Sequence, residues 1–237
     1  MAFHSIISAH RLRFKMLLCL LLGYGLQSGA MILQFHPRFH QQTVLPNDST
    51  RYILQGDTLM IQSLKWYISS VCFLKQGHVV WQEDNSYHLL DATKPTSLIL
   101  ALNTPDALSF DQVQFVLGID SSTQSGGVMG VDLDPVQGMY WTWQSGYIHF
   151  KMEGISNRSS ERDHSFQYHV GGYQYPENTV QTINLPVMNA KHLQLAMDID
   201  ELLPSMDMKA HPHIMSPGVE AVRLSEKIKS IFKVLTP

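Results

Sequence analysis

Cysteine is scarce in this sequence: the 237 residues contain two, Cys19 and Cys72. Cys19 lies in an N-terminal segment that we expect to be removed, so only Cys72 would remain, which excludes an intrachain disulfide. The fold must then be held together by its core without covalent help. Cys72 lies within a strand-like run, where a small buried apolar side chain is the ordinary interpretation.

Long hydrophobic runs are also missing. The apolar run Met16–Leu22 is far shorter than the roughly 20 residues that a membrane span needs, so we expect no membrane insertion. The run instead fits a secretory signal. Three basic residues, Arg11, Arg13 and Lys15, precede it, and small residues, Ser28-Gly29-Ala30, supply the cleavage positions.

We therefore predict a signal peptide over residues 1–30, a single domain over residues 31–237, and a periplasmic or secreted location.

Positive charge is in short supply in that domain. The formal net charge of the whole chain is −3, and removing three basic residues with the signal lowers it to −6. An acidic domain is a poor partner for nucleic acid or for an anionic membrane surface.

Familiar catalytic signatures are absent as well. The sequence contains no Gly-x-Ser-x-Gly, no His-Glu-x-x-His, no glycine-rich phosphate loop and no cysteine nucleophile. The known catalytic motifs therefore indicate no active site in this chain. Two longer polar segments, Asp120–Gln137 and Gly154–His164, interrupt the regular pattern, and loops of that length are often functional.

Short runs with period-two alternation fill most of the chain, separated by turn residues. This pattern predicts an all-β fold, an antiparallel β-sandwich with one C-terminal helix. Ser216 can cap the helix and Pro217 suits its first position. The apolar residues that approximate helical spacing are Val222, Ile228, Ile231, Phe232 and Leu235.

The stretch Gly138–Gly154 is the centre of the expected fold, because it places Trp141 and Trp143 between glycines. Apolar and polar side chains alternate in the second half of this stretch, as in a β-strand. One face carries Ile148, Phe150 and Met152, whereas the other carries Tyr147, His149, Lys151 and Glu153. We interpret the paired tryptophans as core residues or as the border of a reactive site, and His149 as a surface residue.

A methionine and histidine cluster precedes the helix. The segment Met206–Met215 holds three methionines together with His211 and His213, and sulfur with imidazole is a ligand set that copper prefers. The alternative is that the methionines fill core gaps. His36 and His169 leave the apolar parity of their strands and are further ligand candidates. Metal binding predicts that His36, His169 and His213 converge.

A second functional class remains open on the residues alone. Trp66, Trp81, Tyr140 and Tyr147 could form an exposed aromatic platform that binds a glycan or a peptide. That interpretation predicts exposed rings and scattered histidines, whereas copper binding predicts grouped imidazoles. A purely structural exported protein predicts neither arrangement.

Six motifs in this order resemble the MbnP-like copper-binding domain. They are Leu33-Gln-Phe35, the Gly56-Asp-Thr58 turn leading to Leu64-Lys-Trp-Tyr-Ile-Ser69, His88-Leu-Leu-Asp91, Phe115-Val-Leu-Gly-Ile-Asp120, Gly138-Met-Tyr-Trp-Thr-Trp-Gln-Ser-Gly-Tyr147 and Tyr168-His-Val-Gly171. The resemblance covers nearly the whole of the expected domain. Some relatives carry several loop cysteines that this chain lacks.

The resemblance implies a periplasmic β-sandwich that binds copper and works beside a dihaem cytochrome of the MbnH type, which oxidises a tryptophan of its partner to kynurenine. It implies His169 as a copper ligand and Trp141 and Trp143 as the tryptophans of the paired motif. His36 and His213 are assigned more loosely, whereas His211 and Met215 are metal candidates from their own segment alone. On this interpretation the protein is a substrate of a haem enzyme and not itself an enzyme. The two long loops would then offer a surface to the haem partner.

Overall fold

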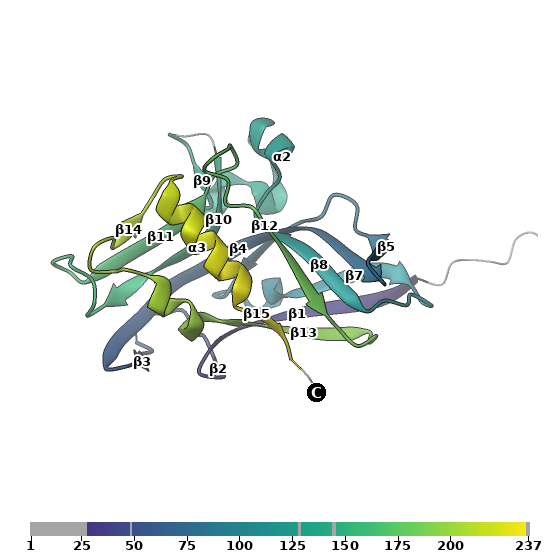
Figure 1. The fold of residues 1–237 in the computed structure, drawn as a ribbon, viewed down its shortest axis with the longest axis horizontal. Helices are drawn as coiled ribbons and strands as arrows, with labels where there is room; N and C mark the ends of the chain where they lie inside the picture. Colours follow the sequence, from purple (N-terminus) through teal and green to yellow (C-terminus); the bar gives the residue numbers. More distant parts are fainter. Residues whose placement is uncertain (1–27, 48, 128, 144–145, 236–237) are drawn as a thin grey trace, which may run out of the picture.

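Two β-sheets pack face to face in the computed structural model, which describes residues 28–47, 49–127, 129–143 and 146–235 (Figure 1). The smaller sheet contains β1 (Ser28–Phe39), β2 (Gln42–Thr43), β7 (Ile99–Pro105), β13 (His192–Asp198) and β15 (Phe232–Val234). The larger sheet contains β3 (Tyr52–Leu54), β4 (Asp57–Lys75), β5 (His78–Gln82), β6 (Tyr87–Asp91), β8 (Gln112–Leu117), β9 (Tyr140–Trp141), β10 (Gly146–Ser156), β11 (Ser165–Gly171), β12 (Gln181–Pro186) and β14 (His213–Ile214).

The all-β sandwich expected from the sequence is confirmed, but its sheets are mixed. β1 pairs in parallel with β13, and β11 pairs in parallel with β14. The other recorded pairs of described strands are antiparallel. Each parallel pair joins segments that are far apart along the chain, because parallel neighbours need a long crossover connection. Turn signals between neighbouring strands reveal hairpins only, so the sequence pattern did not expose these two pairs.

Strand β4 runs the length of the larger sheet and shows how the alternation is shifted along it. The β4 positions that belong to the main core are odd at Leu59 and Ile61, even from Leu64 to Ile68, and odd again from Val71. The pairing register shifts at both changes of parity. Each β-bulge inserts one extra residue, which turns the following side chains to the opposite face.

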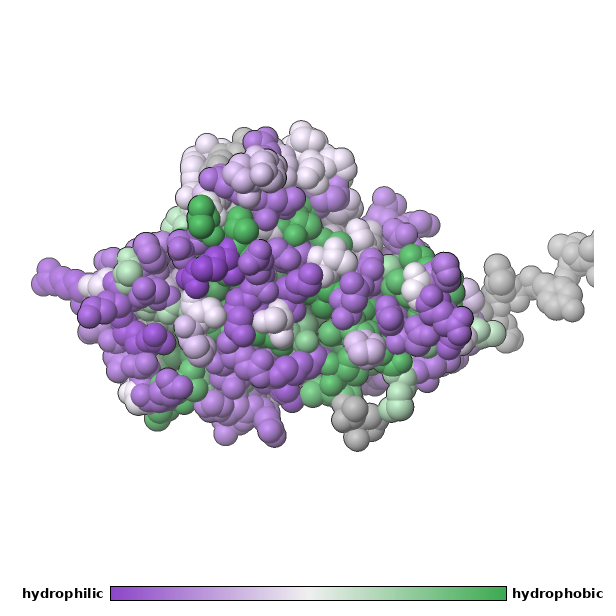
Figure 2. Space-filling model, viewed as in Figure 1, coloured by the Kyte–Doolittle hydropathy of each residue, from purple (hydrophilic) through white to green (hydrophobic). Residues whose placement is uncertain are grey.

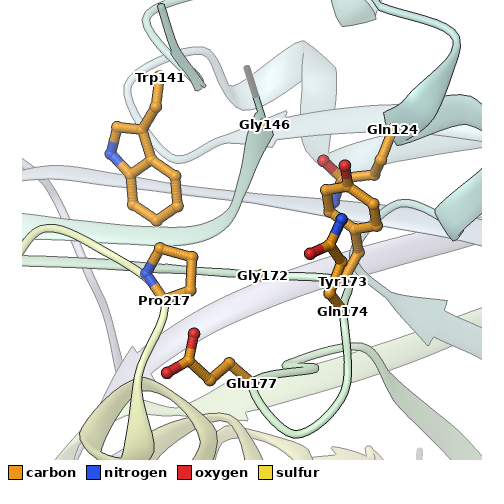
Figure 3. A pocket seen from close by; sticks show the side chains of 8 residues that line it. All are labelled: Gln124, Trp141, Gly146, Gly172, Tyr173, Gln174, Glu177 and Pro217. Atoms are coloured by element: carbon orange, nitrogen blue, oxygen red, sulfur yellow. The ribbon is translucent and has the colours of Figure 1, made fainter. Parts of the chain in front are cut away.

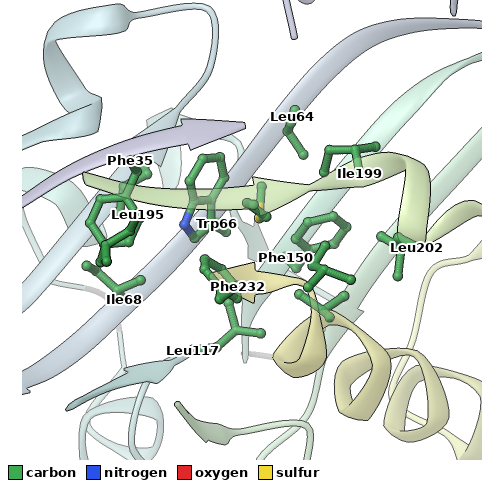
Figure 4. Close-up of a cluster of buried hydrophobic side chains, with 14 of the residues drawn as sticks. Phe35, Leu64, Trp66, Ile68, Leu117, Phe150, Leu195, Ile199, Leu202 and Phe232 are labelled. Atoms are coloured by element: carbon green, nitrogen blue, oxygen red, sulfur yellow. The ribbon is translucent and has the colours of Figure 1, made fainter. Parts of the chain in front are cut away.

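The main core lies between the two sheets (Figure 4). Trp66 of β4 is completely buried there. The smaller sheet contributes Phe35 and Leu195, whereas Phe150 comes from β10 of the larger sheet. Met206 and Met208 are also buried in this core, so these two methionines fill core space, as the alternative interpretation of their segment expected.

A second buried cluster covers part of the outer face of the larger sheet. It consists of Tyr67, Leu89, Ile119, Leu133, Met139, Trp141, Tyr147 and Ile148. The segment expected to be a long polar loop covers it and contains short helices, α2 (Ser121–Ser125), η2 (Val131–Leu133) and η3 (Pro135–Gln137). Tyr67 donates its hydroxyl to the carbonyl of Asp132 at 2.7 Å, which fixes this cover to the sheet.

The C-terminal helix forms, but it is shorter than expected. α3 spans Val219–Ser230, and its N-cap is Gly218, with no side-chain cap. Phe232 belongs to β15, which pairs with β13. The predicted Ser216 cap and the continuation of the helix through Phe232 are therefore wrong, because pairing with the smaller sheet overrides the helical spacing. The face of the molecule that α3 crosses is largely hydrophilic (Figure 2).

The remaining helices are short 3-10 turns, η1 (Pro95–Leu98), η4 (Ile199–Glu201) and η5 (Leu203–Ser205). Within the described ranges, no helix combines the length and the apolar character that a membrane crossing requires. Residues 1–27 of the predicted signal peptide, including Cys19, lie outside the described residues. β1 begins at Ser28.

Candidate metal-ligand face and tryptophan pair

Strands β10 and β11 present a polar face on the side of the larger sheet that points away from the main core. His169 of β11 lies opposite Lys151 of β10, while its neighbours Tyr168 and Val170 point into the core. His169 is nevertheless only 6% exposed. A side chain on the outer face of the sheet is thus almost fully buried.

Glu153 of β10 holds the His169 ring. The His169 Nε2 atom lies 2.7 Å from Glu153 Oε1, and Lys151 Nζ lies 3.3 Å from the same oxygen. Burial alone would raise the pKa of Glu153, but the hydrogen bond from His169 and the charge of Lys151 outweigh it and lower that pKa. An ionised carboxylate only accepts hydrogen bonds, so His169 donates its Nε2–H.

The other ring nitrogen of His169 has no partner. Nδ1 is buried and makes no hydrogen bond. In the neutral imidazole with a proton on Nε2, Nδ1 carries a free lone pair. A histidine whose second nitrogen is fixed by a carboxylate is the usual arrangement of a metal ligand. The chemistry of His169 therefore fits a metal, with Nδ1 as the donor atom.

β14 brings two further candidates to the same face. His213 pairs with Gln167, and the alternate residue Ile214 is buried in the core, so His213 lies on the side of His169. Its Nε2 lies 3.5 Å from Glu161. Met215 directly follows β14 and is 39% exposed.

His211 is exposed at the surface rather than placed with this group. Its backbone carbonyl accepts the hydroxyl of Tyr168 at 2.8 Å, and it borders a groove that also contains Arg158 and Arg223. The contact of His211 is therefore this backbone hydrogen bond, which supports β11.

His36 lies on the other sheet. It belongs to β1, whose neighbours Phe35 and Phe39 are buried in the core, so the His36 side chain faces away from the core on the opposite side of the sandwich from His169. Burial lowers the pKa of His36, and the charges of Arg38 and His192 lower it further. The structure does not bring His36 together with His169 and His213.

Across the described ranges, no three His, Cys, Asp or Glu side chains are grouped so that they could hold a metal ion. The expected convergence of three imidazoles is therefore absent from this part of the chain. What the structure places on one face is His169 and His213, and Met215, a thioether, directly follows β14.

The two tryptophans of the paired motif have opposite environments. Trp141 is 5% exposed and Trp143 is 66% exposed, and their ring centroids are 6.0 Å apart. Trp141 lies over Gly171, where an added Cβ would come within 2.8 Å of the indole ring. Glycine at this position of β11 is what allows the indole to lie against the sheet, two residues from His169.

A cavity of about 140 Å³ opens beside Trp141. Trp141 and Pro217 lie on one side of it, and Gln124 and Tyr173 lie on the opposite side (Figure 3). The Trp141 Nε1 atom is buried without a hydrogen-bond partner. The buried indole thus combines an open cavity at its edge with an unused donor.

His149 is buried completely, so its interpretation as a surface residue is wrong. A β-bulge between Ile148 and Phe150 breaks the alternation, and all three side chains become buried. Gln124 accepts the Tyr147 N–H at 2.7 Å and donates to His149 Nε2 at 2.5 Å. His149 Nδ1 donates to Thr179 at 2.9 Å, so the ring is neutral and fully used.

The aromatic platform is not formed. Trp66 is 0% exposed and Tyr147 is 1% exposed, and Trp81 and Tyr140 are partly buried against the two clusters. Sequence reasoning counted these rings as a surface because it had no measure of depth within the sandwich. It also gave no role to Glu153, although the Lys151 and Glu153 alternation opposite a histidine strand was a usable signal.

The two packed sheets and their C-terminal helix define an all-β sandwich protein. The MbnP family profile matches residues 28–216, and the chain belongs to the MbnP family. Its fold is similar to that of MbnP from Methylosinus trichosporium, with a TM-score of 0.52 and 12% identity, covering 81% of this chain and 82% of that chain. This likeness concerns the fold. Curated proteins gave no match.

Proposed function

We propose that this chain is an exported copper-binding protein, periplasmic or secreted, that serves copper acquisition or homeostasis and is not itself an enzyme. The observation that carries the proposal is the His169 imidazole, which is 6% exposed, fixed by Glu153 at 2.7 Å and left with an unpartnered, buried Nδ1. Membership of the MbnP family supports copper as the metal.

Residues that would hold the copper are His169 through Nδ1, His213 from the adjacent strand β14 and Met215, which follows that strand. Imidazole and thioether donors together accommodate both Cu(I) and Cu(II). Glu153, itself paired with Lys151, keeps the ring orientation of His169. His36 and His211 lie outside this set.

A second part of the proposal concerns the tryptophan pair. A dihaem cytochrome of the MbnH type would oxidise one tryptophan to kynurenine, whose amine adds a nitrogen donor that an indole lacks. Trp143 is 66% exposed and therefore accessible to a protein partner. Its ring lies beside that of the buried Trp141. The segments 120–137 and 154–164 offer the surface for that partner.

The test is intact mass and metal analysis on protein exported by its native host, compared with the same chain produced without a dihaem partner. We expect about one copper per chain and, on a peptide that contains Trp141 and Trp143, the net gain of one oxygen atom and loss of one carbon atom that convert tryptophan to kynurenine. A His169→Ala variant should lose the copper, and His78→Ala, on the exposed strand β5, is the matched control.

The two parts fail separately. Copper bound to a chain with unmodified tryptophans would leave metal binding in place and remove the haem partner. Absence of copper from the native chain, or full retention of copper by His169→Ala, would contradict the proposed site.

A further inference from the structure

The start of β1 bears on where the exported chain is cut. Its first residues are paired with β7, with Ser28 opposite Pro105, Gly29 opposite Thr104 and Ala30 opposite Asn103. Thr104 donates its hydroxyl to the Gly29 carbonyl at 3.4 Å. Cleavage after Ala30, the position that small residues alone would suggest, removes this paired segment and leaves the end of β7 as an unpaired edge.

Gly29 is also enclosed by the fold. A Cβ placed on it would lie 2.3 Å from Asp106 Oδ1 and 3.4 Å from Lys191 Nζ, and these two side chains form an ion pair at 3.1 Å. The chain at Gly29 therefore packs against the Asp106–Lys191 ion pair. A segment that pairs with one strand and packs against an ion pair is part of the domain.

Cleavage after Ala30 would also create a charged terminus in an unsuitable place. The new α-ammonium would belong to Met31, whose side chain is 3% exposed and lies in the main core. A charged group is disfavoured next to buried apolar side chains. Within the full strand, the same nitrogen is an ordinary peptide N–H.

An alternative position with the required small residues lies upstream. Gly23-Tyr24-Gly25 places small residues at the third and first positions before the Gly25–Leu26 bond, directly after the apolar run that ends at Leu22. We propose that signal peptidase hydrolyses the Gly25–Leu26 bond, so that the mature chain begins at Leu26 and retains the whole of β1. Water is added across the peptide bond, which leaves a carboxylate on Gly25 and an α-ammonium on Leu26.

This inference rests on export, which belongs to the proposed function, and it is independent of copper. The test is to express the full chain in a Gram-negative host, isolate it from the periplasm, and determine its N-terminus by intact mass and N-terminal sequencing. The expected N-terminus is Leu26. An N-terminus at Met31, or anywhere else within β1, would overturn the inference and leave export standing, whereas an unprocessed chain would overturn both.

Two variants sharpen the result. Gly25→Gln should abolish the Leu26 terminus, whereas Ala30→Gln, at an exposed strand position, should leave it unchanged; the reverse pattern would contradict the proposal. A chain that begins at Met31 should also unfold at a Tm several degrees below that of a chain that begins at Leu26. Equal Tm values would show that the residues before Met31 do not stabilise the fold, which would contradict the proposal.

Discussion

His169 of β11 donates its Nε2–H to Glu153 of β10 at 2.7 Å, and this pair fixes which nitrogen the ring can offer to a metal. If His169 binds copper through Nδ1, Glu153→Ala should weaken copper binding about 10–100-fold, because loss of the supporting carboxylate frees the ring and its tautomer. The measurement is a competition titration with a chelator of known affinity.

The chain offers a matched control for that experiment. Glu83 makes a similar 2.7 Å contact with His88 at a site with no proposed role, so Glu83→Ala should leave copper affinity unchanged. Equal affinities for Glu153→Ala and the unmodified chain would contradict the assignment of His169.

Gly171→Ala should displace Trp141. The added Cβ would lie 2.6 Å from the Tyr147 carbonyl oxygen and 2.8 Å from the indole ring, so overpacking should reduce the free energy of unfolding by about 1–3 kcal/mol. Chemical denaturation and the fluorescence of Trp141 report this. At Gly130, no atom lies within 4 Å of an added Cβ, and Gly130→Ala should change neither measurement appreciably.

The buried His149 should make stability depend on pH. Burial lowers its pKa from 6.5 to about 3, so between these values the unfolded chain binds a proton that the folded chain does not. The contribution of neutral His149 to the free energy of unfolding is fully present above pH 6.5. It is lost as pH falls, by roughly 1.4 kcal/mol per pH unit. Denaturant unfolding between pH 7 and pH 5 measures this slope.

The neighbours that bond to the His149 ring, Gln124 and Thr179, do not titrate, so they add nothing to the slope. Since the pKa of His36 is also lowered, substitution of His149 is needed to isolate its share of the slope. In a His149→Gln variant it should become shallower, even if the variant is less stable at pH 7. An NMR spectrum that shows the His149 ring protonated at pH 5 in the folded chain would contradict this account.

Phe232→Ala should cost about 3–5 kcal/mol of unfolding free energy. Phe232 is 4% exposed and contacts Phe115 across the sandwich at a ring-centroid distance of 5.5 Å. Lys229→Ala, on an exposed position of α3, should stay within about 0.5 kcal/mol. Thermal or urea unfolding compares the two, and similar values would show that the C-terminal strand adds little to the core.

Local patterning predicted much of this fold. Alternation in Ile148 to Met152 marked a strand, and the turn residues between short runs predicted a sandwich, because both depend on neighbours along the chain. The same reasoning misplaced His149, since a single bulge reverses the side to which a residue points. It also extended the final helix into Phe232, whose strand forms only by pairing with β13.

The sequence by itself determined the all-β class, the spacing of the strands and the residues that could bind copper, because residue type and period decide these locally. Only the tertiary structure decided which of them meet. It placed His169 and His213 on one face and His36 on the opposite side of the sandwich. The reason is physical: distant strands such as β11 and β14 are paired by packing of the whole core, and no local pattern records their register.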